Sequence, residues 1–297
     1  MVWRLPKRSR KVALLEGATA GALFGTAAIF IRFLAVLSVF SIALWRLVIA
    51  SSVLILLLLV QRQTFRFSEL RQDLFRICIL GVFLGLHFIL FVSAVMDTAI
   101  INATVLVNTT PIWSIFISTV TFKLRPSRLA ALGITASFLG VGIIAYGDAA
   151  SKVWTLNLKG DLEAVLAAVV EALYLNYGRD IRRRAQLLTL MLAIYVASAV
   201  TVLVAGVVTK SDLTLPTHLT LFLALLGLGL LPTAMAHTFY FSSLSNLKSF
   251  ETATMALLEP IGATLLGVLI FAEFPNVFFV FGAVFVLSGI ISVAIGE

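Results

Sequence analysis

One stretch of this 297-residue sequence occurs twice in diverged form. Residues 102–147 align without a gap on residues 251–296 at an offset of 149 positions, and eight of the 46 aligned positions are identical. The identities include two prolines, one of which pairs Pro111 with Pro260, and three glycines. Proline and glycine act where helices break, turn or touch, so the two copies should share one backbone plan. Each copy predicts a helix with a central proline, a turn with a second proline, and a helix interrupted by glycines.

The composition places this duplicated unit in a membrane. The chain is 61% hydrophobic and 12% charged, with a mean hydropathy of +1.09. Soluble domains contain about 45–50% apolar and about 25% charged residues, so a soluble fold could not bury this much apolar surface. The single cysteine, Cys78, allows no disulfide within the chain.

Runs of about 20 apolar residues predict ten transmembrane helices. The first run follows a basic N-terminal segment but is too long for a cleavable signal peptide. The expected spans are 13–34, 39–60, 75–96, 100–121, 128–147, 160–178, 187–208, 218–241, 251–271 and 277–296.

The basic residues predict the orientation of these spans. If the N-terminus is cytoplasmic, seventeen of the 22 lysines and arginines fall on that side, against Lys152, Lys159 and Lys210 on the other. This asymmetry predicts that both termini are cytoplasmic. The +8 net charge lies in short segments between apolar runs rather than in one patch, so we expect a lipid bilayer around the chain and no nucleic-acid partner.

Five spans in each half would place the second copy upside down in the membrane. The predicted fold is an all-α membrane protein, with ten transmembrane helices arranged as two inverted five-helix repeats. The first repeat, 1–147, includes a basic cytoplasmic tail; residues 148–159 form an external linker, and 160–297 form the second repeat. A half-turn about an axis in the membrane plane should place Pro111 on Pro260.

Two motifs resemble a known family. The C-terminal sequence LLEPIGATLLGVLIFAEFP, followed by GAVFVLSGIISVAIG, and the Trp45-Arg46-Leu47 tripeptide resemble the drug/metabolite transporter superfamily, EamA type. The resemblance implies export of small metabolites, and it is strongest to the bacterial aromatic amino acid exporters of the inner membrane. The family often has an acidic residue at the end of both proline-containing helices. Here Glu273 fills the second position, whereas Lys123-Leu124 replaces the first.

Pro111 and Pro260 are candidate hinges. Each proline removes a helical hydrogen bond and frees the carbonyl four residues earlier, at Val107 and Ala256. These carbonyls need a neighbouring hydroxyl, water or a bound ligand inside a bilayer. A structural kink satisfied by threonine or asparagine is the alternative interpretation.

Polar and aromatic side chains of the inner helices predict a substrate cavity between the repeats. Glu171 lies near the bilayer centre, where an ionised group costs about 2.5–3.5 kcal/mol and by default marks function. Position 87 aligns with 236, so His87 and His237 are near-equivalents. Ordinary helix packing remains the alternative for each residue. The expected cavity residues are His87, Phe91, Asn102, Thr109, Trp113, Glu171, Tyr174, His237 and Tyr240.

Three further features bear on packing and on the site. Glycines spaced by four residues at 17, 21 and 25, and at 81 and 85, predict close helix contacts. Arg46 is deep and should have a carboxylate or carbonyl partner, whereas Glu259 fits a structural and a functional role equally. No ligand spacing for a metal occurs near the histidines, and we expect no metal and no cofactor.

These features predict a transporter rather than an enzyme. The expected activity is export of amino acids, aromatic and other large apolar ones, by alternating access, and a monomer is expected. A substrate of another metabolite or drug class is the main alternative, followed by a non-transport membrane subunit or an intramembrane enzyme. Motifs for zinc proteases, serine hydrolases and P-loop enzymes do not occur in the sequence.

Overall fold

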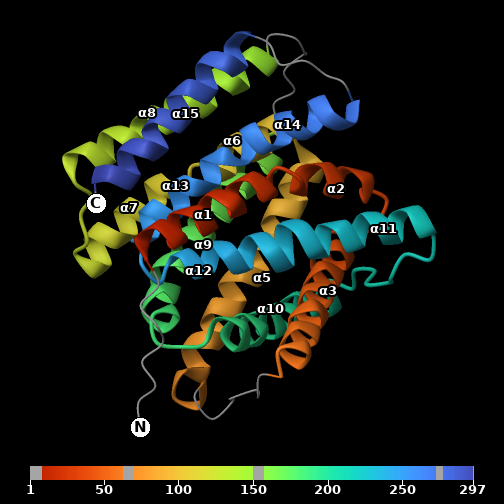
Figure 1. The fold of residues 1–297 in the computed structure, drawn as a ribbon. Helices are drawn as coiled ribbons and strands as arrows, with labels where there is room; N and C mark the ends of the chain where they lie inside the picture. The colour runs from red at the N-terminus through yellow and green to blue at the C-terminus, as the bar shows by residue number, and fades with distance from the viewer. Residues whose placement is uncertain (1–8, 63–69, 150–156, 272–276, 297) are drawn as a thin grey trace.

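The computed structural model describes residues 9–62, 70–149, 157–271 and 277–296, and these residues form a bundle of helices (Figure 1). Within these ranges no strand occurs. The N-terminal tail before residue 9, residues 150–156 of the expected linker, and Glu273 lie outside the described residues.

Most of the described chain is helical. From the N-terminus onward the helices are α1 (Arg10–Phe24), α2 (Ala27–Phe33), α3 (Val39–Val60), η1 (Arg71–Asp73), α5 (Leu74–Asp97), α6 (Ile100–Val107), α7 (Thr110–Phe122), α8 (Arg128–Ala149), α9 (Leu158–Arg182), α10 (Leu187–Val208), α11 (Leu219–Leu228), the π-helix η2 (Gly229–His237), α12 (Thr238–Ser243), α13 (Ser249–Met255), η3 (Ala256–Leu258), α14 (Glu259–Phe271) and α15 (Val277–Gly296).

Eight helical stretches of the described chain are long and apolar enough to cross a membrane. They match eight of the ten expected spans, and the chain is therefore a multi-pass membrane protein. The expected spans 160–178 and 251–271 correspond to α9 and to the interrupted α13–η3–α14 stretch, which are not among the eight. Charged residues at both ends of α9 lower its hydropathy. Length and composition therefore do not establish the count of ten.

Polar residues begin several of these helices. Ser9, Ser38 and Asn157 precede α1, α3 and α9, and each side chain accepts a hydrogen bond from a backbone N–H in the first turn. Such caps satisfy donors that the first helical turn leaves free. They fix where the helices start at the ends of the bundle.

Helices α8 and α15 lie side by side at one edge of the bundle (Figure 1). Gly133 lies against the carbonyl of Gly289, and Gly140 lies against the carbonyl of Gly282. The 149-residue offset makes Gly133 equivalent to Gly282 and Gly140 equivalent to Gly289. If both glycines of one contact are replaced by their equivalents, the other contact results. Contacts exchanged in this way relate the two helices by a two-fold axis and make them antiparallel.

Helix α1 packs on the proline-broken helix of the other half. A methyl group added at Gly21 would overlap the carbonyl oxygen of Met255, and one added at Gly25 would overlap the backbone of Ala263. The predicted glycine contact of the first span is therefore confirmed. Small residues permit this close backbone approach inside a membrane.

Helix α9 makes the reciprocal contact with α6 and α7. The Asn176 side chain accepts a hydrogen bond from the Ser118 hydroxyl at 2.6 Å and donates one to the Ser114 hydroxyl at 3.0 Å. The leading helix of each half thus lies on the broken helix of the other half. This exchange agrees with the inverted arrangement that the sequence repeat predicts.

The second predicted glycine pair joins α5 to α10. Gly81 approaches the backbone of Ala197 and Ser198, and Gly85 approaches the carbonyl of Ser198 and the side chain of Thr201. The two helices can therefore pack without intervening bulky side chains, as the four-residue spacing predicts.

Alanine substitutions of two glycines in α8 should shift stability in opposite directions. At Gly140 the added methyl group meets Gly282 and overpacks the contact, which typically costs about 1–3 kcal/mol. At Gly142 no heavy atom lies within 4 Å, so alanine should add about 1 kcal/mol of helix propensity. Thermal unfolding of the purified variants in detergent tests this. An apparent Tm of Gly140→Ala that equals or exceeds that of Gly142→Ala would contradict the packing.

Candidate functional site

Both proline-containing helices break in the interior of the bundle. The first break separates α6, ending at Val107, from α7, which begins at Thr110. The second separates α13 from α14, which begins at Glu259 after a short 3₁₀ turn starting at Ala256. The 149-residue offset places Val107 on Ala256 and Thr110 on Glu259. The predicted breaks are therefore confirmed at equivalent positions in the two halves.

The carbonyls next to these breaks have local partners. The Thr110 hydroxyl donates a hydrogen bond to the Val107 carbonyl at 2.7 Å. The backbone N–H of Glu259 donates to the Ala256 carbonyl. These bonds support the structural interpretation of the prolines, although each carbonyl retains a second lone pair for another donor.

A cavity of about 30 Å³ lies between the two breaks. A cavity of this size holds about two water molecules, so an amino acid requires the helices to move apart. The cavity residues come from both halves of the chain. They are Phe24, Ala27, Arg46, His87, Phe88, Phe91, Val107, Asn108, Thr110, Glu171, His237, Ala256 and Glu259.

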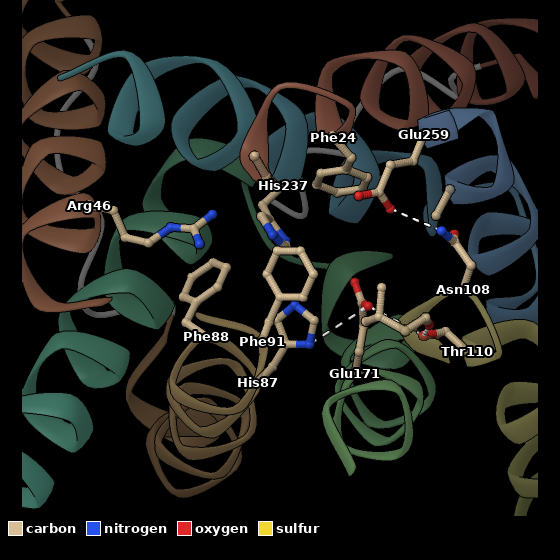
Figure 2. Close-up of a pocket in the computed structure, with 13 residues that line it drawn as sticks. Phe24, Arg46, His87, Phe88, Phe91, Asn108, Thr110, Glu171, His237 and Glu259 are labelled. Carbon is tan, nitrogen blue, oxygen red and sulfur yellow. Dashed lines mark hydrogen bonds and ion pairs between the residues drawn. The ribbon is translucent and has the colours of Figure 1, made fainter. Parts of the chain in front are cut away.

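Two buried carboxyl groups face this cavity, and both are held by the first helix break (Figure 2). The Asn108 amide donates to Glu259 Oε2 at 3.1 Å. The Thr110 hydroxyl lies 3.4 Å from Glu171 Oε2. Each glutamate is 6% exposed, so water contributes little to its solvation. Carboxyl groups placed at this depth suit recognition of a cation or a proton.

His87 extends the polar cluster around Glu171. Its Nδ1 atom lies 3.1 Å from the Ala167 carbonyl oxygen and 3.8 Å from Glu171 Oε2. A carbonyl oxygen only accepts hydrogen bonds, so Nδ1 must carry a proton. The histidine therefore presents an N–H group toward the carboxylate side of the cavity.

His237 lies at the junction of the aromatic residues. Its ring contacts the edges of Phe24 and Phe88, each with a centroid separation of 4.8 Å, and lies 5.9 Å from the ring of His87. His237 is one residue later than the repeat offset predicts from His87. The preceding π-helix, η2, closes its hydrogen bonds over five residues instead of four and thus takes in an additional residue. Both histidines consequently reach the cavity.

Arg46 lies across the cavity from the two carboxyl groups, with aromatic rings between them (Figure 2). Its guanidinium carbon is 4.0 Å from the centroid of the Phe88 ring, and its Nε donates to the Thr233 hydroxyl at 2.9 Å. We expected a carboxylate or carbonyl partner for Arg46. The partners are instead a hydroxyl and a ring, and Nη1 has no hydrogen-bond partner among the described residues.

Four of the nine expected cavity residues line the cavity: His87, Phe91, Glu171 and His237. The two expected tyrosines are fully buried behind it. Tyr240 contacts the Phe24 ring at a centroid distance of 5.2 Å. Tyr174 directs its hydroxyl toward the sulfur of Met191, at 3.8 Å.

Asn102, Thr109 and Trp113 do not line the cavity. The Asn102 amide donates to the Thr98 hydroxyl, and the Trp113 indole N–H donates to the Thr109 hydroxyl at 3.2 Å. The expected span 100–121 treated these residues as one continuous helix. The helix is instead interrupted at residues 108–109, between α6 and α7.

Several lining residues were not among those expected from the sequence. Glu259 fitted either a structural or a functional role, and Asn108 and Thr110 fitted capping of the carbonyls beside the first proline. The repeat carried a usable signal, because Thr110 aligns with Glu259 and both are polar. Phe24 and Phe88 lie in apolar runs, and nothing in the sequence separates them from core phenylalanines.

Comparisons with known proteins agree with this architecture. The model of the EamA-like transporter family matches the chain twice, over residues 11–146 and 158–295. One solved structure, described only as the crystal structure of a protein, superposes with a TM-score of 0.80 at 20% sequence identity and covers 96% of both chains. A search of the curated proteins finds no match. The two family matches cover most of the sequence and divide it into the same halves as the repeat, and this chain therefore belongs to the EamA-like transporter family.

Proposed function

We propose that this membrane transporter exports amino acids with aromatic or other large apolar side chains, by alternating access through the cavity between the repeats. The observation that carries the proposal is the combination of Glu171 and Glu259 with aromatic rings around one buried cavity. A carboxylate provides a counter-charge for an ammonium group, and the rings provide an apolar surface for a side chain.

The helix breaks suit the head group of an amino acid. Helices α7 and α14 both begin at the cavity, at Thr110 and Glu259. Helix N-termini carry a partial positive charge, and broken helices in transporters direct such ends at anionic substrate groups. A substrate carboxylate would lie at these ends while its ammonium group contacts Glu171 or Glu259. The side chain would then extend among the rings.

Polar contacts at opposite ends of the bundle support alternating access. Arg10 pairs with Glu251 at the start of α1 and α13. Lys159 pairs with Asp97 at 2.6 Å. Arg32, near the far end of the same first span as Arg10, donates to the carbonyl of Thr98, which follows Asp97. The two ion pairs are therefore separated by about the length of a transmembrane helix. Opening one end while the other stays paired would expose the cavity to one side.

A drug or another small metabolite is the alternative substrate class. A cation with an apolar body would also match the carboxyl groups and the rings. A nucleotide sugar fits less well, because its phosphates require several cations in a low-dielectric site and Arg46 is the single lysine or arginine among the cavity residues. The basic residues of the loops favour a cytoplasmic location for both termini, and the resemblance to bacterial exporters favours a bacterial inner membrane.

Transport by purified protein in liposomes tests the substrate class. Labelled tryptophan and phenylalanine should move, and unlabelled choline-like cations, polar amino acids and nucleotide sugars should compete weakly. Glu171→Gln should reduce transport about ten-fold or more, because a hydrogen bond to a charged group is lost. Asp180→Asn, on the same helix but exposed, is the matched control. If neither amino acid moves while labelled choline-like cations or nucleotide sugars do, the proposed substrate is ruled out.

Loss of the Lys159–Asp97 ion pair and loss of the Arg10–Glu251 ion pair should have opposite effects on which end of the bundle opens. A cysteine at Asn102 in a Cys78→Ser background would report opening near Lys159, through its rate of labelling by an impermeant maleimide. Lys159→Gln should raise that rate about two- to five-fold, the range expected for a partly exposed ion pair. Glu251→Gln should lower it by favouring opening at the other end. Lys210→Gln is the control, because Lys210 has no ion pair within the described part of the chain. Equal effects of Lys159→Gln and Glu251→Gln would exclude opposed ends.

The prolines should control movement more than stability. Pro111→Ala and Pro260→Ala restore a backbone N–H, and one hydrogen bond contributes about 1 kcal/mol. We expect an unchanged or higher apparent Tm together with transport that is several-fold slower. Pro216→Ala, in the segment before α11 and away from both helix breaks, should leave the transport rate unchanged. Normal transport rates in both helix-break variants would limit these prolines to a packing role.

A further inference from the structure

Arg46 is a buried cation without a compensating anion. Its side chain is 1% exposed, and no acidic side chain among the described residues lies within ion-pair distance of it. Nη1 also lacks a hydrogen-bond partner there. An ionised group within a bilayer is costly, and a buried charge without a partner is strongly destabilising. The resting structure therefore leaves a strong donor available for an acceptor.

The protein holds this guanidinium in a fixed orientation. Nε donates to the Thr233 hydroxyl, and that hydroxyl in turn donates to the Leu228 carbonyl at 2.7 Å, five residues earlier along the π-helical segment. The Phe88 ring lies against one face of the guanidinium at 4.0 Å. Two sides of the group are thus occupied, and Figure 2 shows it directed toward His237 and the interior of the cavity.

The position of Arg46 separates it from the carboxyl groups that would bind the substrate head. The rings of Phe88 and His237 lie 4.8 Å apart between Arg46 and the side of the cavity that holds Glu171 and Glu259 (Figure 2). The ammonium and carboxylate of an α-amino acid are attached to one carbon atom. A head group at the helix breaks consequently cannot contact Arg46 as well, and the end of a long side chain can.

We infer that Arg46 is a specificity-determining residue that binds an oxygen acceptor at the far end of the substrate side chain, such as a phenol oxygen or a carboxylate. This inference rests on the proposed function for the placement of the head group. The rings of Phe88 and His237 lie between the two polar ends, and once the helices move apart they suit contact with a flat apolar body. The favoured class is an aromatic amino acid with a distal oxygen, rather than an unsubstituted one.

Competition for transport in proteoliposomes tests the inference with three probes that share one head group: phenylalanine, tyrosine and 4-carboxyphenylalanine. For the unmodified protein, 4-carboxyphenylalanine should inhibit at about ten- to hundred-fold lower concentration than phenylalanine, with tyrosine between them. Arg46→Gln should bring the three inhibition constants together. The readout is the ratio between probes, which a merely structural role of Arg46 would not change.

Two more variants guard against loss of folding. Arg46→Lys keeps the charge but loses the flat, multi-donor geometry, so it should retain part of the preference. Thr233→Val removes the hydroxyl that orients the guanidinium and should also reduce the ratio. An unchanged ratio in every variant that transports phenylalanine overturns the inference, and amino acid transport then still stands.

A binding measurement separates the inference from the proposed function. 4-Methylbenzoate should raise the apparent Tm of the purified protein, and Arg46→Gln should abolish that shift at constant chloride concentration. If none of the three amino acids is transported, the proposed function fails and this shift still decides the role of Arg46. A different result would be that replacement of chloride by gluconate changes the Tm of the unmodified protein but not that of Arg46→Gln, while 4-methylbenzoate changes neither. In that case an inorganic anion is the ligand of Arg46 and the inference is wrong.

Discussion

Backbone groups released by helix breaks have no bulk water to bind inside a bilayer, and the centre of this bundle is organised around that constraint. Thr110 satisfies the carbonyl of Val107, and the hydroxyl of Thr26 satisfies that of Leu23 where α1 gives way to α2. Glu259 supplies its backbone N–H at the last break. Polar side chains are therefore required at the depth where an apolar bundle would otherwise exclude them. Thr110 and Glu259 also form part of the cavity wall, so two of the breaks share their residues with the site.

The sequence predicted those parts of the fold that depend on backbone geometry. Proline and glycine act through their own covalent structure, so the matched breaks and the glycine contacts followed from position alone. The site was less accessible to prediction. Trp113 was assigned to the cavity on the assumption of one continuous helix over residues 100–121, but the helix is interrupted at residues 108–109 and Trp113 does not line the cavity. The partner of Arg46 depends on the packing of α3 against η2, which are separated by more than 160 residues in the chain.

Duplication supplied equivalent positions, and substitution made them chemically different. Thr110 and Glu259 occupy the same place in their repeats, one as a neutral hydroxyl and the other as a carboxyl group. Arg46 and Tyr195 are likewise 149 residues apart, and both donate a hydrogen bond to Thr233. Arg46 donates to the Thr233 hydroxyl at 2.9 Å, and Tyr195 donates to the Thr233 carbonyl at 2.8 Å. A symmetric scaffold thus surrounds a polar, asymmetric cavity. Such a cavity can hold a substrate in one orientation.

Because of the π-helix before it, the position of His237 in the cavity depends on the number of residues in that helix. In an α-helix each residue rotates the next by about 100°, so the addition or removal of one residue turns every later side chain to another face. The wider turn of η2 absorbs one residue and leaves the helix axis continuous into α12. His237 consequently meets His87 across the cavity instead of facing lipid or a neighbouring helix. A single-codon deletion within this segment would hardly change the composition, the hydropathy or the length of the span, and it would still remove the imidazole from the site.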